Sequence, residues 1–315
     1  MIKILIADKI AKEAIDLINS TAGMQADVKQ GLSEDELSKI IGEYDGVLVR
    51  SATKITAKVL TNPGKLRAIA RAGAGVDNID VPAAKSKNIT VMNTPGGNTI
   101  SVAEHVFALM LGMIRQVVPA CNSLKSGAWD KKKFMGNQLN KKVMGIIGLG
   151  KIGLAVAVRA KAFNMKIIGY DPYTVPPDAK KIGIEIADKV ERIYREADFI
   201  TVHVPKSKET INMIGAEQIA MMKPTVRLVN TARGGIINED ALCDALAANK
   251  IAGAALDVYS EEPPKNTRCM KFDNCLVTPH LGANTTEAQI ECGIEAAQIV
   301  IDYLSGKPAR NVVKG

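Results

Sequence analysis

Residues 143–171 read VMGIIGLGKIGLAVAVRAKAFNMKIIGYD, and this stretch decides the fold of the chain around it. An apolar run from Val143 to Ile147 leads into the glycine-rich sequence GLGKIG at 148–153. An amphipathic segment follows, and then a second apolar run that ends in Asp171. This order predicts a strand, a tight turn, a helix, a second strand and an acidic residue at the end of that strand.

Each glycine of the turn has a physical role in binding a dinucleotide. Gly148 permits the tight turn, Gly150 lets the backbone approach a pyrophosphate, and Gly153 lets the helix pack close to the sheet. The helix begins at Lys151 and Ile152, where free N–H groups and the helix dipole favour the negative charge of the pyrophosphate. We therefore expect this chain to bind a dinucleotide.

Asp171 narrows the choice of dinucleotide. Its carboxylate can accept hydrogen bonds from both hydroxyls of an adenosine ribose, and it would repel a 2′-phosphate. Pro172, Tyr173 and Thr174 supply no arginine or lysine to hold such a phosphate. The sequence therefore favours NAD over NADP, while an alternative stays open in which Asp171 only caps the turn after its strand.

The bulk composition is typical of a globular protein of the cytoplasm. A chain of 315 residues predicts two domains, and 47% hydrophobic with 23% charged residues is an ordinary balance. No apolar run approaches the ~20 residues of a membrane span, and residues 1–7 read as a first strand rather than a signal peptide. We expect a soluble cytoplasmic protein that does not bind a membrane.

Cysteine usage points in the same direction. The chain has five cysteines, an odd number without a CxxC pair: Cys121, Cys243, Cys269, Cys275 and Cys292. This pattern favours free thiols in a reducing compartment over a disulfide framework or a structural zinc site. We therefore expect neither a disulfide nor a bound metal.

The net charge of +8 does not by itself predict a nucleic-acid partner. Lysines and arginines are scattered, aromatic residues make up only 4% of the chain, and the densest basic cluster is Lys131, Lys132 and Lys133. We expect no nucleic acid to bind. Two explanations of the basic balance stay open, a solvated surface and the steering of an anionic substrate.

The first part of the chain alternates between strand-like and helical patterns. Strand-like runs cover residues 2–7, 46–49, 68–70 and 89–92, with a weaker run at 26–29. Helical patterns lie between them, and Ser33 with Glu36 forms a capping box that opens the second helix. The alternation predicts a parallel sheet with helices on both faces, and TPGGN at 94–98 reads as a linker.

The second part begins with a long apolar helix, expected from Ser101 to about Val118 and buried, in part at a subunit contact. Further strands are expected at 199–204, 227–230, 254–256 and 276–278. A last helix at about 286–304 follows these strands, and we expect it to return to the first domain. The predicted domains are therefore 1–95 with 287–315, and 96–286, with the active site in the cleft between them.

Polar residues follow three strands of the second domain, where such sheets bind their ligands. They include Arg233, Glu262 and His280. Hydride transfer to or from a hydroxy acid needs an acid–base group, for which histidine has a suitable pKa, and a cation for the substrate carboxylate, for which arginine has a suitable shape. Each residue has a structural explanation when taken singly, a buried ion pair or a core histidine. Together they favour catalysis.

The other two histidines have different settings. His105 lies within the apolar helix and is expected to be structural. His203 ends a strand and could pack under the cofactor. His280 is therefore the candidate for the acid–base group.

Seven segments resemble the D-isomer-specific 2-hydroxyacid dehydrogenases, and within them the phosphoglycerate dehydrogenases. They are VRSATKIT at 49–56, RAGAGVDNID at 71–80, MNTPGGN at 92–98, GLGKIG at 148–153, NTARGG at 230–235, ALDVYSEEPP at 255–264 and TPHLGA at 278–283. The narrower likeness rests on VRSATKIT and on WDKKKFMG at 129–136. The resemblance implies an α/β fold of two doubly wound parallel-sheet domains, a Rossmann NAD-binding domain and a smaller flavodoxin-like substrate domain.

The resemblance also implies roles for single residues. Arg233 would bind and polarise the substrate, Glu262 would pair with the base, and His280 would exchange the proton. The residues that would bind or line the cofactor are Ala74, Gly148, Gly150, Lys151, Ile152, Gly153, Asp171, Val204, Thr231, Ala232, Arg233, Asp257 (near the nicotinamide), His280, Gly282 and Ala283.

A second set would bind the substrate: Arg50, Ser51, Ala74, Gly75, Asn98, Arg233 and His280. Backbone N–H groups at Ala74 and Gly75 would hold its carboxylate, while Arg50, Ser51 and Asn98 would reach its far end, where phosphoglycerate carries a phosphate. Ala74 departs from the family pattern, in which a hydroxyl residue is frequent, so a side-chain bond from this position is lost. In a homodimer or homotetramer, a lysine of the 131–133 cluster would reach across from the partner subunit.

The implied activity is the NAD-dependent oxidation of D-3-phosphoglycerate to 3-phosphohydroxypyruvate in serine biosynthesis. A glyoxylate or hydroxypyruvate reductase of the same superfamily is the alternative, and Arg50 with the basic balance favours an anionic, phosphorylated substrate. Formate dehydrogenases carry glutamine at the place of Glu262, and NAD-sensing corepressor relatives are disfavoured because no disordered tail is present. Because the chain stops at Gly315, we expect a short form without the serine-sensing domain of longer relatives.

Overall fold

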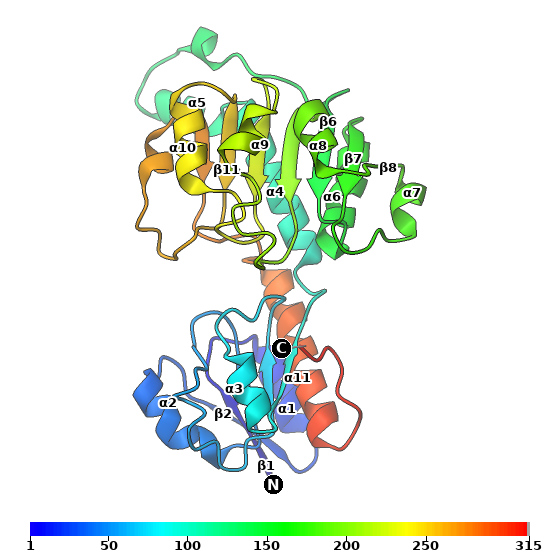
Figure 1. The fold of residues 1–315 in the computed structure, drawn as a ribbon. Coiled ribbons are helices and arrows are strands. Elements are labelled where there is room, and N and C mark those ends of the chain that lie inside the picture. The colour runs from blue at the N-terminus through cyan, green and yellow to red at the C-terminus, as the bar shows by residue number, and fades with distance from the viewer. Residues whose placement is uncertain (314–315) are drawn as a thin grey trace. The chain divides into compact units, whose positions relative to one another are not determined.

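The structure, a computed structural model, describes residues 1–313, so the last two residues of the expected 287–315 segment lie outside the described part. The chain divides into two compact units (Figure 1). Unit 1 consists of Met1–Thr99 with Ala283–Gly315, and unit 2 consists of Ile100–Gly282. The borders expected from the sequence, after residues 95 and 286, lie a few residues from these.

Unit 1 is built on a parallel sheet of five strands within its described residues. The strands are β1 (Ile2–Ile6), β2 (Met24–Val28), β3 (Gly46–Val49), β4 (Ala68–Arg71) and β5 (Thr90–Asn93). Their spatial order is β2-β1-β3-β4-β5, which is the order of flavodoxin-like folds. The expected fold of this unit is confirmed.

Helices cover both faces of this sheet because successive strand residues point to opposite faces. Ile4 and Ile6 of β1 pack with α1 (Lys12–Ser20) and α11 (Thr286–Leu304), which lie side by side in Figure 1. Leu5 of β1 faces the other way, toward α2 (Glu34–Ile40), η1 (Ile41–Glu43) and α3 (Val81–Ser86). The last helix therefore completes the first unit, as the sequence predicts.

The predicted capping box at the start of α2 is confirmed. The Ser33 Oγ accepts from the Glu36 backbone N–H at 3.3 Å, and the Ser33 backbone N–H donates to Glu36 Oε2 at 2.8 Å. These bonds satisfy backbone donors that the first helical turn leaves without partners.

Unit 2 is built on a parallel sheet of seven strands within the described chain. They are β6 (Val143–Ile147), β7 (Lys166–Tyr170), β8 (Glu185–Ile186), β9 (Phe199–Val202), β10 (Arg227–Asn230), β11 (Gly253–Leu256) and β12 (Cys275–Val277). The spatial order β12-β11-β10-β9-β6-β7-β8 reverses direction beside β6. This is the Rossmann arrangement with one added strand, and the expected fold is confirmed.

Two layers of helices enclose this sheet. One face packs against α4 (Thr99–Ile114) and α6 (Lys151–Ala162), and the other against α8 (Val190–Glu196), α9 (Ala216–Ala220) and α10 (Glu239–Ala247). The remaining elements of this unit are α5 (Val117–Lys125), α7 (Asp178–Ile182), η2 (Lys131–Phe134) and η3 (Arg268–Lys271). Both faces of the sheet are therefore buried, which explains the apolar runs of its strands.

The expectation of one helix from Ser101 to Val118 is wrong. The helix α4 ends at Ile114, and Gln116 adopts a left-handed conformation (φ 51°) before α5 begins. The Asn137 backbone N–H donates to the Ile114 carbonyl at 3.0 Å and so takes an acceptor that a continuing helix would use. Val117 and Val118 are exposed rather than buried.

In residues 1–313, every single helix is too short or too polar to cross a membrane. The pair α4 and α5 passes by length and composition only, and it bends by 60° at the break.

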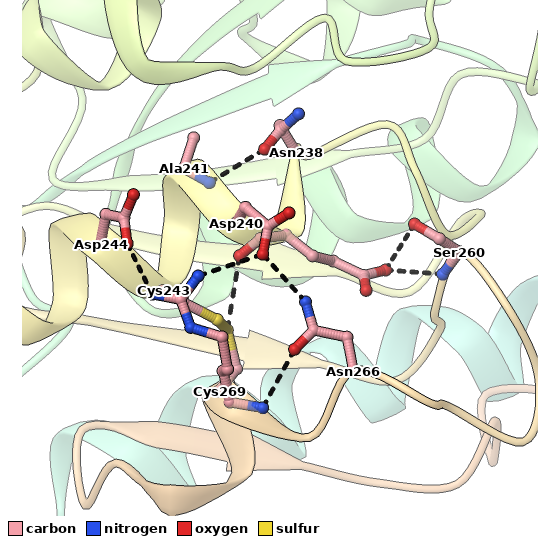
Figure 2. The surroundings of a disulfide bond; sticks show 10 residues. Asn238, Asp240, Ala241, Cys243, Asp244, Ser260, Asn266 and Cys269 are labelled. Carbon is pink, nitrogen blue, oxygen red and sulfur yellow. Dashed lines mark hydrogen bonds and ion pairs between the residues drawn. A yellow bond between two sulfur atoms is a disulfide. The ribbon is translucent and has the colours of Figure 1, made fainter.

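The expectation of free thiols is wrong for two cysteines. Cys243 of α10 and Cys269 of η3 form a disulfide with a Cα–Cα distance of 5.3 Å (Figure 2). Cys121, Cys275 and Cys292 are free. The odd number of cysteines did not exclude a disulfide, because two cysteines far apart in sequence can meet in the fold while the others stay single.

Candidate active site

The predicted residues of unit 2 gather at the carboxyl ends of its parallel strands. The glycine-rich turn follows β6, Asp171 follows β7, His203 and Val204 follow β9, and Thr231, Ala232 and Arg233 follow β10. Asp257 follows β11, and the turn with His280 and Gly282 follows β12. Since parallel strands end at the same edge, these side chains lie along one edge of the sheet.

The glycines of the turn fit the roles predicted for them. Gly148 has a positive φ of 97°, and a Cβ on Gly153 would lie 2.1 Å from the Gly148 carbonyl oxygen. A Cβ on Gly150 would meet no described atom within 4 Å, although Gly150 caps α6. The fold itself therefore needs Gly148 and Gly153, whereas the open approach to Gly150 leaves room for a ligand at the helix N-terminus.

Asp171 has a structural role that the sequence left open. Its Oδ2 accepts from the Leu149 backbone N–H at 2.7 Å, inside the glycine turn. Its Oδ1 accepts from the N–H groups of Tyr173 and Thr174, at 2.8 and 3.0 Å. The carboxylate thus caps the turn after β7 and braces the glycine turn, and one lone-pair position is left for a ribose hydroxyl.

Two buried polar atoms near this edge have no hydrogen-bond partner among the described residues. They are Thr231 Oγ1 and His203 Nδ1. Burial lowers the pKa of His203 to about 3, so its ring is neutral, and Nε2 lies 3.0 Å from Thr201 Oγ1. Buried polar atoms without partners are rare, and a bound dinucleotide would supply partners here. The residues at this edge therefore fit the expected cofactor.

His280 and Glu262 are in direct contact. His280 Nδ1 lies 2.6 Å from Glu262 Oε2, and the side chains are 46% and 38% exposed. Burial tends to raise the pKa of Glu262, but the hydrogen bond and charge of His280, the Tyr259 N–H and the charge of Arg233 outweigh it and lower that pKa. The carboxylate is therefore ionised, and it must accept a hydrogen from Nδ1, which leaves Nε2 free to take a proton.

The loop after β10 brings Arg233 to this pair. Asn230 braces the loop, because its side chain accepts from the Ala232 N–H at 3.0 Å and donates to the Arg233 carbonyl at 2.9 Å. A Cβ on Gly234 would lie 1.8 Å from the Tyr259 carbonyl oxygen. Only glycine therefore permits the close approach of the Arg233 loop to the segment that leads to Glu262.

The segment 260–269 around Glu262 is fastened to α10. Ser260 binds Glu239 Oε1 through both its N–H (2.6 Å) and its hydroxyl (2.7 Å). Asn266 binds Asp240 (Figure 2). The Arg268 guanidinium bridges Asp240 and Asp244, next to the disulfide. These contacts were not predicted, because they join residues more than 20 positions apart.

Asp257 is fully buried, and its carboxylate binds the turn that carries His280. Its Oδ1 also lies 3.2 Å from Nε2 of His105. The resemblance implies a place near the nicotinamide for Asp257, and the apolar helix predicts a structural role for His105. The one signal for the contact was a histidine within an otherwise apolar helix.

The predicted substrate residues Arg50, Ser51, Ala74, Gly75 and Asn98 all lie in unit 1, as does Ala283. Asn78 donates to the Arg50 carbonyl at 2.7 Å, and Asn93 donates to the Ala74 carbonyl at 2.6 Å, so both loops are braced by side chains. Asn98 Oδ1 is buried without a partner among the described residues.

Arg71 is a residue of unit 1 that sequence reasoning missed. A Cβ on Gly73 would lie 2.1 Å from Arg71 Nη1, so the guanidinium covers the loop that leads to Ala74. Burial raises the pKa of the Cys292 thiol, and the charges of Arg71 and Arg50 act against that rise. Both cations therefore lie in the electrostatic surroundings of Cys292. In the described chain, no three His, Cys, Asp or Glu residues gather as a metal site would require.

Residues 107–282 match a family model described as D-isomer specific 2-hydroxyacid dehydrogenase, NAD binding domain. The chain belongs to this family. Its unit 2 is therefore an NAD-binding domain, and the cofactor predicted from the glycine turn and Asp171 is NAD.

Curated relatives match over almost the whole of this dehydrogenase chain. A D-3-phosphoglycerate dehydrogenase of Synechocystis sp. is 47% identical over 313 residues, which is 99% of this chain and 56% of that protein. That of Archaeoglobus fulgidus is 46% identical over 312 residues, 99% of this chain and 59% of that protein. The chain thus spans a little over half the length of these relatives.

Among solved structures, a D-lactate dehydrogenase from Aquifex aeolicus, complexed with NAD and lactic acid, is similar to this chain with a TM-score of 0.83. The two are 28% identical, and the match covers 96% of each chain.

Proposed function

We propose that this protein is an NAD-dependent D-2-hydroxyacid dehydrogenase that oxidises D-3-phosphoglycerate to 3-phosphohydroxypyruvate, a step of serine biosynthesis. The observation that carries the proposal is the 2.6 Å contact of His280 Nδ1 with Glu262 Oε2, beside Arg233, at the ligand-binding edge of an NAD-binding domain. The 44–47% identity to D-3-phosphoglycerate dehydrogenases over 99% of the chain supports this substrate.

Three side chains would carry the reaction. Bound NAD would accept a hydride from C2 of the substrate. As the hydride leaves, Nε2 of His280 accepts the proton of the C2 hydroxyl, and the Glu262 carboxylate stabilises the resulting positive charge through Nδ1–H. Arg233 binds the substrate carboxylate through its planar fork and polarises the oxygen on C2.

The cofactor would be held along the strand ends of unit 2. The first turn of α6, with Lys151 and Ile152, would bind the pyrophosphate, and Asp171 the ribose. Val204, Thr231, Ala232, Asp257 and Gly282 would line the rest of its site, and we assign Ala74 and Ala283 to the same site.

In unit 1, we assign the substrate carboxylate to the N–H groups of Ala74 and Gly75. The phosphate would bind Arg50, Ser51 and Asn98, with Arg71 as a second cation. Arg50→Ala should then raise KM for phosphoglycerate far more than for an unphosphorylated D-2-hydroxy acid, because only phosphoglycerate loses a charge-assisted bond. Equal losses on both would mean that Arg50 serves the fold or the carboxylate.

A substrate panel tests the proposal. Initial rates with NAD would be measured for D-3-phosphoglycerate, D-glycerate and D-lactate, and with NADH for glyoxylate and hydroxypyruvate. The highest kcat/KM should belong to D-3-phosphoglycerate. A preference for glyoxylate or hydroxypyruvate would instead make the protein a reductase of the same family, and NAD binding without turnover would favour an NAD-sensing role.

We also propose a cytoplasmic homodimer or homotetramer. Exposed apolar side chains stand on α5 and the segment after it: Val117, Val118, Leu124, Trp129 and Met135, the last two exposed by 81% and 82%. A second copy of the chain would cover them, and Lys131, Lys132 and Lys133 lie within the same segment. Light scattering should give twice or four times the chain mass, and Trp129→Glu should lower it.

A further inference from the structure

Asp257 is a charged group in a fully buried place. Its side chain has 0% exposure, and four donors bind its carboxylate. Burial tends to raise its pKa, but hydrogen bonds from His105, Thr278 and the N–H groups of Leu281 and Gly282 outweigh burial and lower that pKa. An ionised group at such a site is stable only when its lone pairs are satisfied, so these donors belong together as one unit.

The Asp257 carboxylate also binds the backbone of the two residues that follow His280. The N–H groups of Leu281 and Gly282 donate to Oδ1 and Oδ2 of Asp257 at 2.7 and 2.8 Å. The His280 N–H donates to the Asp257 carbonyl at 2.8 Å. His280 itself has a φ of 55°, a left-handed conformation that is uncommon for a residue with a side chain and that local hydrogen bonds can stabilise. Asp257 accepts these hydrogen bonds.

His105 of α4 contacts both Asp257 and Thr278. Its Nε2 lies 3.2 Å from both Asp257 Oδ1 and Thr278 Oγ1. The Thr278 hydroxyl is 2.6 Å from Asp257 Oδ1 and gives its hydrogen to that ionised oxygen, which can only accept. Nε2 of His105 must therefore carry a hydrogen and donate it to Thr278 Oγ1, with Asp257 Oδ1 also 3.2 Å away. The ring is 17% exposed, so water has little access to replace it.

We propose that His105 is a positioning residue for catalysis, which rests on the proposed function in which His280 is the base. Through Nε2–H, His105 holds the Asp257 carboxylate and the Thr278 hydroxyl in place. These two groups hold the 278–282 turn, and the turn holds the His280 ring against Glu262. Rate depends on this alignment, since a displacement of ~1 Å can cost about 100-fold. The helix α4 is thus connected to the base through a chain of hydrogen bonds.

Two substitutions at His105 separate a donor from mere bulk. Gln at this position can place an amide N–H near the position of Nε2, whereas Leu fills a similar volume without a donor. We expect His105→Leu to lower kcat by about 10- to 100-fold, and His105→Gln to restore most of kcat. Glu104→Gln, on the same helix at a 64% exposed side chain, is the matched control and should behave as wild type.

A second variant approaches the chain of bonds from its other end. Thr278→Val preserves shape and removes the hydroxyl, and it should reproduce the kcat loss of His105→Leu. Combined with His105→Leu, it should cost much less than the product of the two single losses, because both break one network. Multiplicative losses would overturn the proposal.

Amide hydrogen exchange at Leu281 and Gly282 is the readout that does not depend on turnover. It should accelerate in His105→Leu and stay near wild type in His105→Gln and Glu104→Gln. Unchanged exchange in His105→Leu overturns the inference, and so does a kcat loss that His105→Gln shares in full. A wild-type protein that oxidises no 2-hydroxy acid would instead overturn the proposed function, while the exchange rates still decide whether His105 holds the turn.

Discussion

His280 carries the proton transfer in this account, and its removal has a defined cost. Positioned acid–base catalysis contributes roughly 10²–10⁴-fold to a rate, so His280→Ala should lower kcat by about that factor. NAD affinity, measured by fluorescence titration, should change little, because the contacts proposed for the pyrophosphate and ribose lie at other strand ends. A variant with near-normal kcat would contradict the proposed mechanism.

Glu262 affects the same step through charge. Burial tends to raise the pKa of its carboxyl, but the hydrogen bond and charge of His280 outweigh burial and lower that pKa, which favours the ionised carboxylate. Glu262→Gln keeps the shape and removes the charge that stabilises the positive ring formed when His280 accepts the substrate proton. The acidic limb of the pH profile of kcat/KM should therefore move to lower pH. A limb that stays in place would show that the carboxylate only orients the ring.

The contacts of Asp171 allow two roles, and a substitution can separate them. It braces the glycine turn and caps the next one, and it is also the group proposed to bind ribose and repel a 2′-phosphate. Asp171→Asn keeps an acceptor and removes the charge, so it should relax the preference for NAD over NADP by a few kcal/mol at most. If the NAD:NADP ratio of kcat/KM is unchanged while thermal stability falls, the carboxylate serves only the turns.

At the scale of elements, the disulfide is the feature with the most direct consequence. It joins α10 to η3 across 26 residues, and Cys269 ends the segment 260–269 that contains Glu262. Cross-links over loops of this order stabilise a fold by about 3 kcal/mol, so Cys269→Ser should lower the free energy of unfolding by about that amount. Cys121→Ser, at an exposed free thiol, is the control and should have little effect.

Thiol counting gives an independent check on the same pair. In the unfolded, unreduced protein, three of the five cysteines should react, because Cys243 and Cys269 are linked. Five reactive thiols would show that the pair is reduced in solution.

Local signals explain which elements could be predicted from the sequence. The strand at 227–230 and the helix at 286–304 match the structure because a run of apolar residues or a helical pattern marks their ends. The break between α4 and α5 was missed because Asn137, far along the chain, caps Ile114. The two-residue strand β8 is too short to give a pattern.

The site follows the same rule. The contact of His280 with Glu262 was implied by the family resemblance, whose motifs include the segments that carry both residues. The contact of His105 with Asp257 arises only when α4 packs on the sheet, so no spacing in the sequence announces it.

In the whole molecule, the two units have different proposed roles. Unit 2 carries the NAD-binding domain with Arg233, Glu262 and His280, and unit 1 carries the residues proposed for the substrate carboxylate and phosphate. The two units differ in strand order, since one has the flavodoxin-like and the other the Rossmann arrangement. The helix α11 belongs to the first unit although it follows the second in sequence.

We propose that this protein moves a hydride from C2 of D-3-phosphoglycerate to NAD. This proposal is tested most directly with substrate that carries deuterium at C2, followed by NMR of the reduced cofactor. We expect one deuterium on the nicotinamide ring for each NADH formed, and in His280→Ala the same labelled product at a rate lower by roughly 10²–10⁴-fold. Reduced cofactor without deuterium, or no reduction of NAD by this substrate in the wild-type protein, would contradict it.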